Sequence, residues 1–289
     1  MSSSEELGAA PSLARGAFSI TIATAVSRVT GFIRVVVVAA AMGTTFLANT
    51  YQTANTAPNL LFELVAAGVL TSVFVPTFVS YIANKRADGA WDAANALTSV
   101  AVVGLTGLAI VLGLAAPLVM RVLTIGVSDT EVRAAEVRVG TQLLWLFAPQ
   151  VVFYGTGMIM TAALHAHRRF GAAAVAPIAN NLVMIGVYLA YARLRGEGAP
   201  DIGEVSAAEI WLLGAGTTAG VVAMTLWLVP ACRGLGWRFR FAWKPRHPAV
   251  RKGARLGAWA LGYAGGYQAG LIVVLLLANR IAGGVAAYQ

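Results

Sequence analysis

The chain has 289 residues, of which 58% are apolar and only 11% are charged, and its mean hydropathy is +0.73. This composition excludes an ordinary soluble domain and indicates that lipid is the solvent. The formal net charge of +9 does not indicate nucleic acid, because the basic residues cluster beside apolar runs. The single cysteine, Cys232, excludes an intrachain disulfide and any metal site built on paired cysteines.

Seven apolar segments each reach the roughly 20 residues that a membrane-spanning helix needs. In chain order they cover residues 17–42, 58–83, 94–120, 140–163, 172–192, 208–231 and 254–281. The polar N-terminus has no basic region before a short apolar core, so we predict that no signal peptide is cleaved and that residues 1–16 form a tail. The predicted fold is an all-α integral membrane protein.

Basic residues favour alternate loops, and this bias predicts the orientation of the helices. Lys85 and Arg86 follow the second segment, and Arg168 and Arg169 follow the fourth. The loop after the sixth segment holds the largest group: Arg233, Arg238, Arg240, Lys244, Arg246, Arg251, Lys252 and Arg255. The other loops are uncharged from 43 to 57, mixed from 129 to 138, or mostly acidic from 197 to 209. We therefore predict a cytoplasmic N-terminus.

Aromatic and basic residues alternate between the sixth and seventh segments, in the run Trp-Arg-Phe-Arg-Phe-Ala-Trp-Lys over 237–244. Such a mixture suits the headgroup layer of a membrane. We interpret residues 232–253 as a cytoplasmic linker that lies at the membrane surface and fixes topology. The alternative interpretation is a specific site for lipid headgroups.

Two arginines lie inside the first segment, although an arginine at mid-helix costs about 2.5 to 3.5 kcal/mol on insertion scales unless a cavity or partner receives it. Arg28 is eleven residues into the segment, hence about 16 Å deep. Arg34 follows six residues later, so the two side chains project roughly 120° apart. Gly31 permits a bend or a close helix approach there. We predict that Arg28 and Arg34 bind an anionic substrate; the alternative is that each pairs with a protein group.

Glu63 is the only acidic residue well within a predicted segment. It is predicted to pair with one of the arginines, and coupling to an ion or proton is the alternative. Pro58, Pro76 and Pro177, together with Asn59, are candidates for helix breaks that shape a cavity, although ordinary membrane helices also contain proline.

Gly216 and Gly220 form a pattern typical of close helix packing. They do not belong to a dinucleotide-binding loop, because the last glycine of 214–220 is one position late and no strand precedes it. His165 and His167 lack a third ligand, so no metal site is predicted. No arrangement typical of hydrolysis occurs, and we predict neither an enzyme nor a cofactor.

A series of short motifs matches a known family in order. They are Ser-Arg-Val-Thr-Gly-Phe-Ile-Arg at 27–34, Ala-Pro-Asn-Leu-Leu at 57–61, Gly68, Phe-Val-Pro at 74–76, Phe-Ala-Pro at 147–149, Arg-Phe at 169–170, Ala-Pro at 176–177 and Asn-Asn at 180–181. The chain resembles the MurJ (MviN) family, the lipid II flippases of bacterial peptidoglycan synthesis. The first motif is fairly specific, whereas the later ones are individually weak.

The family belongs to the multidrug/oligosaccharidyl-lipid/polysaccharide exporter superfamily, so the resemblance implies two six-helix lobes around a central cavity. Residues 17–231 would form the first lobe, 232–253 the linker between lobes, and 254–289 the first helix of a truncated second lobe. The chain is thus identified with the N-terminal half of a family member, and we expect residues 1–289 alone to be inactive.

The resemblance implies a multi-pass protein of the bacterial cytoplasmic membrane that moves lipid II from the inner to the outer leaflet by alternating access. Arg28 and Arg34 match cavity arginines of the family and would bind the diphosphate. Phe62 and Asn49 stand where many members have arginine and aspartate, so those two roles do not transfer. Implied partners are lipid II, membrane lipids and cell-wall synthesis enzymes, with no nucleic acid.

Two alternatives remain open. In the first, the cargo is another polyprenyl-linked glycan or a small cation. A cation exporter would need acidic residues in its cavity, and Glu63 alone is poor support for one. The protein can also be a membrane scaffold for cell-wall synthesis that transports nothing. Arginines that line a wet cavity would favour transport, and arginines sealed between helices would favour the scaffold.

Overall fold

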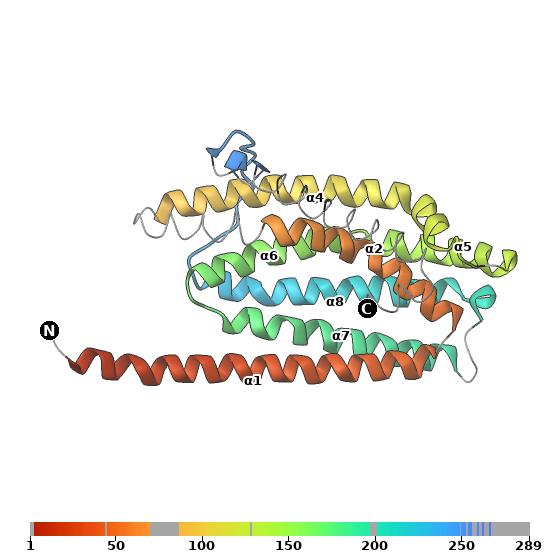
Figure 1. The fold of residues 1–289 in the computed structure, drawn as a ribbon, viewed down its shortest axis with the longest axis horizontal. Coiled ribbons are helices and arrows are strands. Elements are labelled where there is room, and N and C mark those ends of the chain that lie inside the picture. Colours follow the sequence, from red (N-terminus) through yellow and green to blue (C-terminus); the bar gives the residue numbers. More distant parts are fainter. Residues whose placement is uncertain are drawn as a thin grey trace, which may run out of the picture.

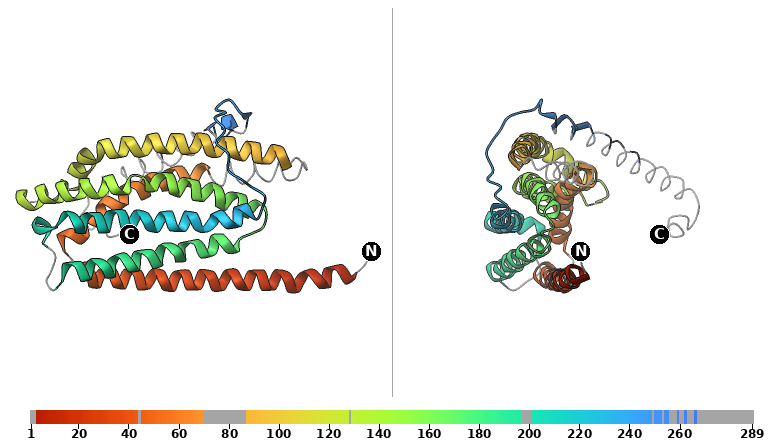
Figure 2. Two further views of the ribbon diagram at one scale, coloured as in Figure 1. Left: turned by 180° about the vertical axis from the view of Figure 1, so that it is seen from behind. Right: turned by 90° about the vertical axis from the view of Figure 1, so that its left-hand side faces the viewer.

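The computed structural model describes residues 3–43, 45–69, 87–127, 129–196 and 201–248, and eight positions between 250 and 266. The helices lie side by side along the long axis of the molecule, and an end-on view shows them as a bundle (Figures 1 and 2). They are α1 (Ser3–Met42), α2 (Phe46–Val69), α4 (Ala87–Leu123), α5 (Thr130–Phe147), α6 (Gln150–Ala166), α7 (Gly171–Arg195), the short 3-10 helix η2 (Ile202–Glu204) and α8 (Ala207–Arg233).

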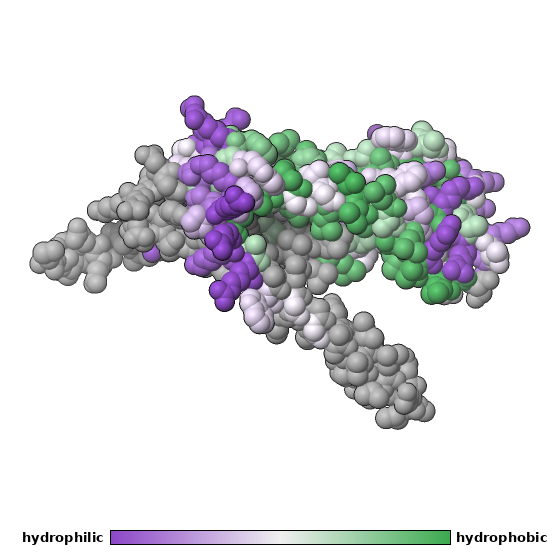
Figure 3. All heavy atoms as spheres, turned by 90° about the horizontal axis from the view of Figure 1, so that it is seen from above, coloured by the Kyte–Doolittle hydropathy of each residue, from purple (hydrophilic) through white to green (hydrophobic). Residues whose placement is uncertain are grey.

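Five stretches of the described part are long and apolar enough to cross a membrane. They are Ile20–Met42, Trp91–Leu123, Thr130–Ala166, Gly171–Arg195 and Ala207–Arg233. Seen from above, a hydrophobic belt separates hydrophilic residues at the two ends of the bundle (Figure 3). The prediction of an all-α membrane protein is confirmed. The predicted segment 254–281 falls almost entirely outside the described residues.

The described helices differ from the predicted segments mainly in where they begin. Helix α1 begins at Ser3, so most of the predicted tail is helical, and α2 begins at Phe46 instead of residue 58. The predicted loop at 43–57 was therefore wrong. The polar composition of this stretch is typical of a loop, but Thr50 and Tyr51 are only 1% exposed because they face other helices.

The predicted segment 140–163 is replaced by two helices, α5 and α6, which meet at Ala148 and Pro149. Helix α5 already begins at Thr130, because the Asp129 side chain accepts hydrogen bonds from the Glu131 and Val132 N–H groups. The predicted mixed loop at 129–138 is thus mostly helical. Its Glu136 is 4% exposed, which corrects the expectation that Glu63 is the only acidic residue within a span.

Helices α7 and α8 form a closely packed pair, and α7 also packs against α1. A Cβ atom added at Gly216 would lie 2.6 Å from Cγ2 of Val187, and one added at Gly220 would meet Oδ1 of Asn180. Because only glycine leaves room for α7 there, the predicted packing role of Gly216 and Gly220 is confirmed.

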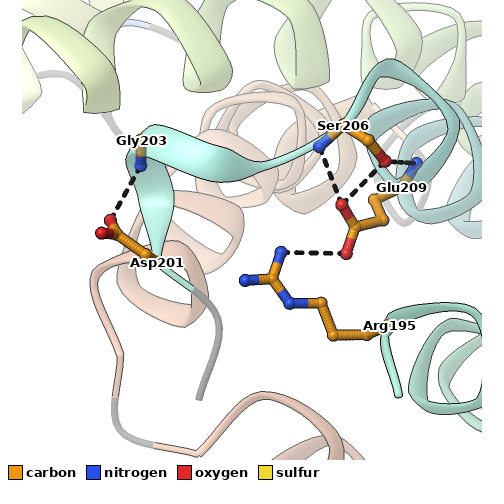
Figure 4. Close-up of polar contacts among 5 residues, drawn as sticks. All are labelled: Arg195, Asp201, Gly203, Ser206 and Glu209. Atoms are coloured by element: carbon orange, nitrogen blue, oxygen red, sulfur yellow. Dashed lines mark hydrogen bonds and ion pairs between the residues drawn. The ribbon is translucent and has the colours of Figure 1, made fainter. Parts of the chain in front are cut away.

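An ion pair and a helix cap lie at the turn between α7 and α8 (Figure 4). Glu209 accepts hydrogen bonds from the backbone N–H of Ser206 and from its hydroxyl, both at 2.7 Å, and from Nη1 of Arg195 at 3.1 Å. Ser206 in turn caps α8 by accepting from the Glu209 N–H. This buried carboxylate therefore fixes both helix ends.

Replacing Glu209 with alanine is expected to destabilise the protein by at least about 2 kcal/mol, because the change removes half of a capping box and a charge-assisted bond. The melting temperature in detergent measures this. Glu204→Ala is the matched control, since Glu204 is exposed on η2; its effect should stay within about 0.5 kcal/mol. Equal melting temperatures for the two variants would contradict the assigned role.

The residues that follow α8 return along the first turns of α4. Trp237 is 4% exposed, and its Nε1 donates to Oδ1 of Asn95 at 3.0 Å, which also accepts from the Arg240 N–H at 3.2 Å. The Ala242 N–H donates to the Ser99 hydroxyl at 2.8 Å. The predicted linker is thus attached to α4 through backbone and side-chain bonds.

Asn95→Ala should release this part of the linker, because the buried Trp237 Nε1–H and the part-buried Arg240 N–H lose their shared acceptor. The expected result is faster trypsin cleavage after residues 238 and 240. Asp92→Ala is the comparison variant: its carboxylate contacts Lys244 at 2.6 Å, but both side chains are about half exposed, and such surface pairs contribute little. Cleavage that accelerates as much in the Asp92 variant would contradict this account.

Candidate substrate-binding site

Three tyrosines from other helices lie within the electrostatic reach of Arg34, inside the membrane-spanning part. The Arg34 guanidinium acts electrostatically on the hydroxyls of Tyr51 of α2, Tyr154 of α6 and Tyr188 of α7. Four helices far apart in sequence therefore contribute to one cluster, which we call the Arg34 cluster. Arg34 and Tyr154 are partly exposed, whereas Tyr51 and Tyr188 are buried.

Hydrogen bonds and ring contacts hold the buried tyrosines in place. The Tyr51 hydroxyl lies 3.0 Å from the Tyr188 hydroxyl and 2.7 Å from Oγ1 of Thr217, which itself donates to the Leu213 carbonyl. The Tyr51 ring meets the rings of Phe147 and Tyr188 edge to face. These partners therefore hold the phenols of Tyr51 and Tyr188 in fixed positions.

Further polar groups of the same helices lack partners. Oδ1 of Asn55, Oε1 of Gln150 and Oδ1 of Asn180 are buried without a hydrogen-bond partner among the described residues. Unsatisfied buried acceptors are uncommon and usually mark bound water or a functional position. Helices α2, α6 and α7 thus supply spare polar groups as well as the tyrosines.

Arg28 lies elsewhere on α1. It is exposed, and among the described residues its charge has no recorded effect on the three tyrosines of the Arg34 cluster. Its neighbours Ser27 and Thr30 face α7, where Nδ2 of Asn181 donates to the Ser27 carbonyl at 3.2 Å and to the Thr30 hydroxyl at 3.1 Å. Gly31 lies at the same interface, since an added Cβ would be 3.5 Å from Nδ2 of Asn181. That distance is an ordinary van der Waals contact, so the role of Gly31 in a bend or a close helix approach stays a prediction.

Neither arginine is sealed between helices. Among the described side chains, no carboxylate lies within 4.0 Å of Arg28 or Arg34. A guanidinium that no carboxylate pairs with can bind an anion through two parallel hydrogen bonds. Substrate binding by Arg28 and Arg34 therefore stays a prediction, and so does pairing with Glu63, whose side chain lies outside the described residues.

The other predicted positions are placed only in part. Pro58 is buried inside α2, whose ribbon changes direction along its length in Figure 1, and Pro177 lies inside α7, so both helices continue through proline. Asn59 is half-buried beside Pro58. Glu63 lies in α2, but its side chain is outside the described residues, as is all of Pro76.

Sequence reasoning missed the tyrosines of the Arg34 cluster. Tyr51 and Asn55 are one helical turn apart and give the only sequence signal, a polar stripe that was assigned to a loop. Tyr51 and Tyr188 are 137 residues apart, so nothing local indicates that they meet.

The family model for the lipid II flippase MurJ matches residues 38–289. The chain belongs to the MurJ family. The match begins four residues after Arg34, so it does not itself cover the two arginines.

Three curated relatives, each named a probable lipid II flippase MurJ, are similar to parts of the chain. The protein of Rhizobium tropici is 34% identical over 60% of this chain and 32% of its own length, and that of Rhizobium meliloti strain 1021 is 31% identical over 63% and 33%. The protein of Synechocystis is 29% identical over 80% and 43%. The matched regions thus span one third to two fifths of the relatives. The MurJ family and the apolar helices together indicate a multi-pass bacterial membrane protein.

Proposed function

We propose that the protein containing this chain is a lipid II flippase, and that the Arg34 cluster receives the diphosphate of lipid II. The observation that supports this most is an arginine inside a membrane-spanning helix whose charge acts on three tyrosine hydroxyls and which has no carboxylate partner among the described side chains. A planar guanidinium can bond two phosphate oxygens at once. Tyr154, which is partly exposed, adds a phenol within the electrostatic reach of Arg34.

In the proposed cycle, the cavity opens toward the cytoplasm, accepts the headgroup at Arg34, and reopens toward the outside while the lipid tail stays in the bilayer. Burial of Tyr51 and Tyr188 supports this, because a rigid wall keeps the cationic site in one place while surrounding helices move. Arg28, exposed on the same helix, would contact the anion before or after Arg34. The N-terminus would be cytoplasmic.

The arrangement of the helices supports placing the basic loops on the same side of the membrane. The start of α4 and the ends of α6 and α8 lie at the same end of the bundle as the start of α1 (Figure 1). A Cβ added at Gly234 would lie 3.2 Å from Nη1 of Arg169, so the loops after α6 and α8 are neighbours. A single cytoplasmic face for these loops follows the positive-inside rule.

The test of the cargo is complementation. Cells depleted of their own flippase express the complete reading frame, and the lipid II in the outer leaflet is measured. The proposal expects the outer-leaflet pool to recover, whereas a scaffold or an exporter of another glycan would leave it depleted at equal protein levels.

A further inference from the structure

A pocket of about 730 Å³ lies where α4, α6 and α8 meet the linker. This volume falls within the roughly 300–1,000 Å³ of typical small-molecule sites. Apolar side chains form much of its wall, among them Val102, Met160, Val229 and Phe239. It shares no residue with the Arg34 cluster.

Two arginines border this pocket. Arg233 is in the last turn of α8 and Arg238 is in the linker; both are exposed, and neither has a carboxylate within 4.0 Å among the described residues. Arg238 is not on a free segment, because Trp237 and Arg240 on either side of it are hydrogen-bonded to Asn95. The pocket is thus lined by two arginines that have no carboxylate partner among the described side chains.

A buried hydroxyl adds to this chamber. Thr98 lines the pocket and is 3% exposed, and its Oγ1 has no hydrogen-bond partner among the described residues. An apolar wall, a spare hydroxyl and two guanidiniums together suit an amphiphile with a phosphate at one end. A free phosphate would gain nothing from the apolar wall.

We propose that this pocket binds an anionic phospholipid of the surrounding bilayer, with an acyl chain along the apolar wall and the phosphate between Arg233 and Arg238. The location fits, because hydrophilic residues meet the hydrophobic belt at the end of the bundle where the linker lies (Figure 3). The bound lipid bridges the end of α8 and the linker, and so stabilises the linker against the lobe.

Native mass spectrometry of the full chain in detergent tests the proposal, with phosphatidylglycerol and phosphatidylcholine of identical acyl chains as probes and no lipid II present. Phosphatidylglycerol is expected to stay bound with at least tenfold preference. The double variant Arg233→Gln/Arg238→Gln should bind it at least tenfold more weakly. The matched control Arg246→Gln/Arg251→Gln removes the same charge from exposed residues that do not line the pocket, and should bind like the parent.

A second variant, Val229→Trp, fills the chamber while keeping both arginines, and should also lose phosphatidylglycerol. Equal retention of the two lipids, or equal binding by the two double variants, would overturn the proposal. Displacement of the lipid by glycerol phosphate at equal concentration would show that the pocket takes a free phosphate instead. None of these binding measurements depends on transport. Their results would therefore be the same if the proposed flippase activity were disproved.

Discussion

Replacing Arg34 with alanine is expected to lower lipid II transport by roughly 10- to 100-fold, because charge-assisted bonds contribute about 1.5 to 3 kcal/mol each. This expectation rests on the proposed binding of the diphosphate by Arg34, which has no carboxylate within 4.0 Å among the described side chains. Arg34→Lys keeps the charge but not the planar fork, and should fall between the parent and the alanine variant. The measurement is the outer-leaflet lipid II pool in depleted cells.

Two further variants make this result interpretable. Arg121→Ala removes an exposed arginine from the last turn of α4 and should transport normally at matched protein levels. Arg28→Ala should reduce transport less than Arg34→Ala, since Arg28 lies outside the Arg34 cluster. Normal transport by Arg34→Ala would mean that the arginine is a structural charge. It would favour the alternatives of a membrane scaffold or of a transporter with another cargo.

The second large effect is expected at the contact of α7 with α8. Gly216→Val places a Cβ within 2.6 to 3.3 Å of three side-chain atoms of Val187, whose branched side chain has one strongly preferred rotamer in a helix. Because neither side chain can turn aside, the helices must separate. We expect a loss of about 1 to 3 kcal/mol, seen as a lower melting temperature and a lower yield of folded protein in detergent.

Gly186→Val is the matched control for this prediction. Gly186 lies in α7 next to Val187, but a Cβ added there meets no atom within 4 Å. The substitution should be neutral or slightly stabilising, because glycine is a poor residue inside a helix. Similar melting temperatures for the two valine variants would show that the helices do not pack as described.

Hydropathy predicted the spans well where apolar runs are flanked by charge. The predicted segments 172–192 and 208–231 lie inside α7 and α8 and end within three residues of both helix ends. It failed where polar residues lie inside the bundle. The residues at 46–57 and 130–138 resemble loops, yet they are helical because Tyr51 finds partners on α7 and α8, and because Asp129 caps α5.

The candidate site was predictable in one part only. An arginine in an apolar helix is costly, so Arg28 and Arg34 were predicted from their positions alone. The residues around Arg34 were not predicted from the sequence, because the Tyr51 hydroxyl contacts Tyr188 and Thr217, which are 137 and 166 residues away along the chain. A helical sequence pattern shows which residues share a face, but not which face of another helix they meet.

The most direct test of the Arg34 cluster is a binding measurement on the purified product of the complete reading frame. Affinity for lipid II is compared with affinity for the corresponding monophosphate lipid, in the parent and in Arg34→Gln. The parent is expected to prefer the diphosphate, and Arg34→Gln is expected to lose this preference together with at least tenfold in affinity. An unchanged preference in Arg34→Gln would contradict the central claim that Arg34 receives the diphosphate.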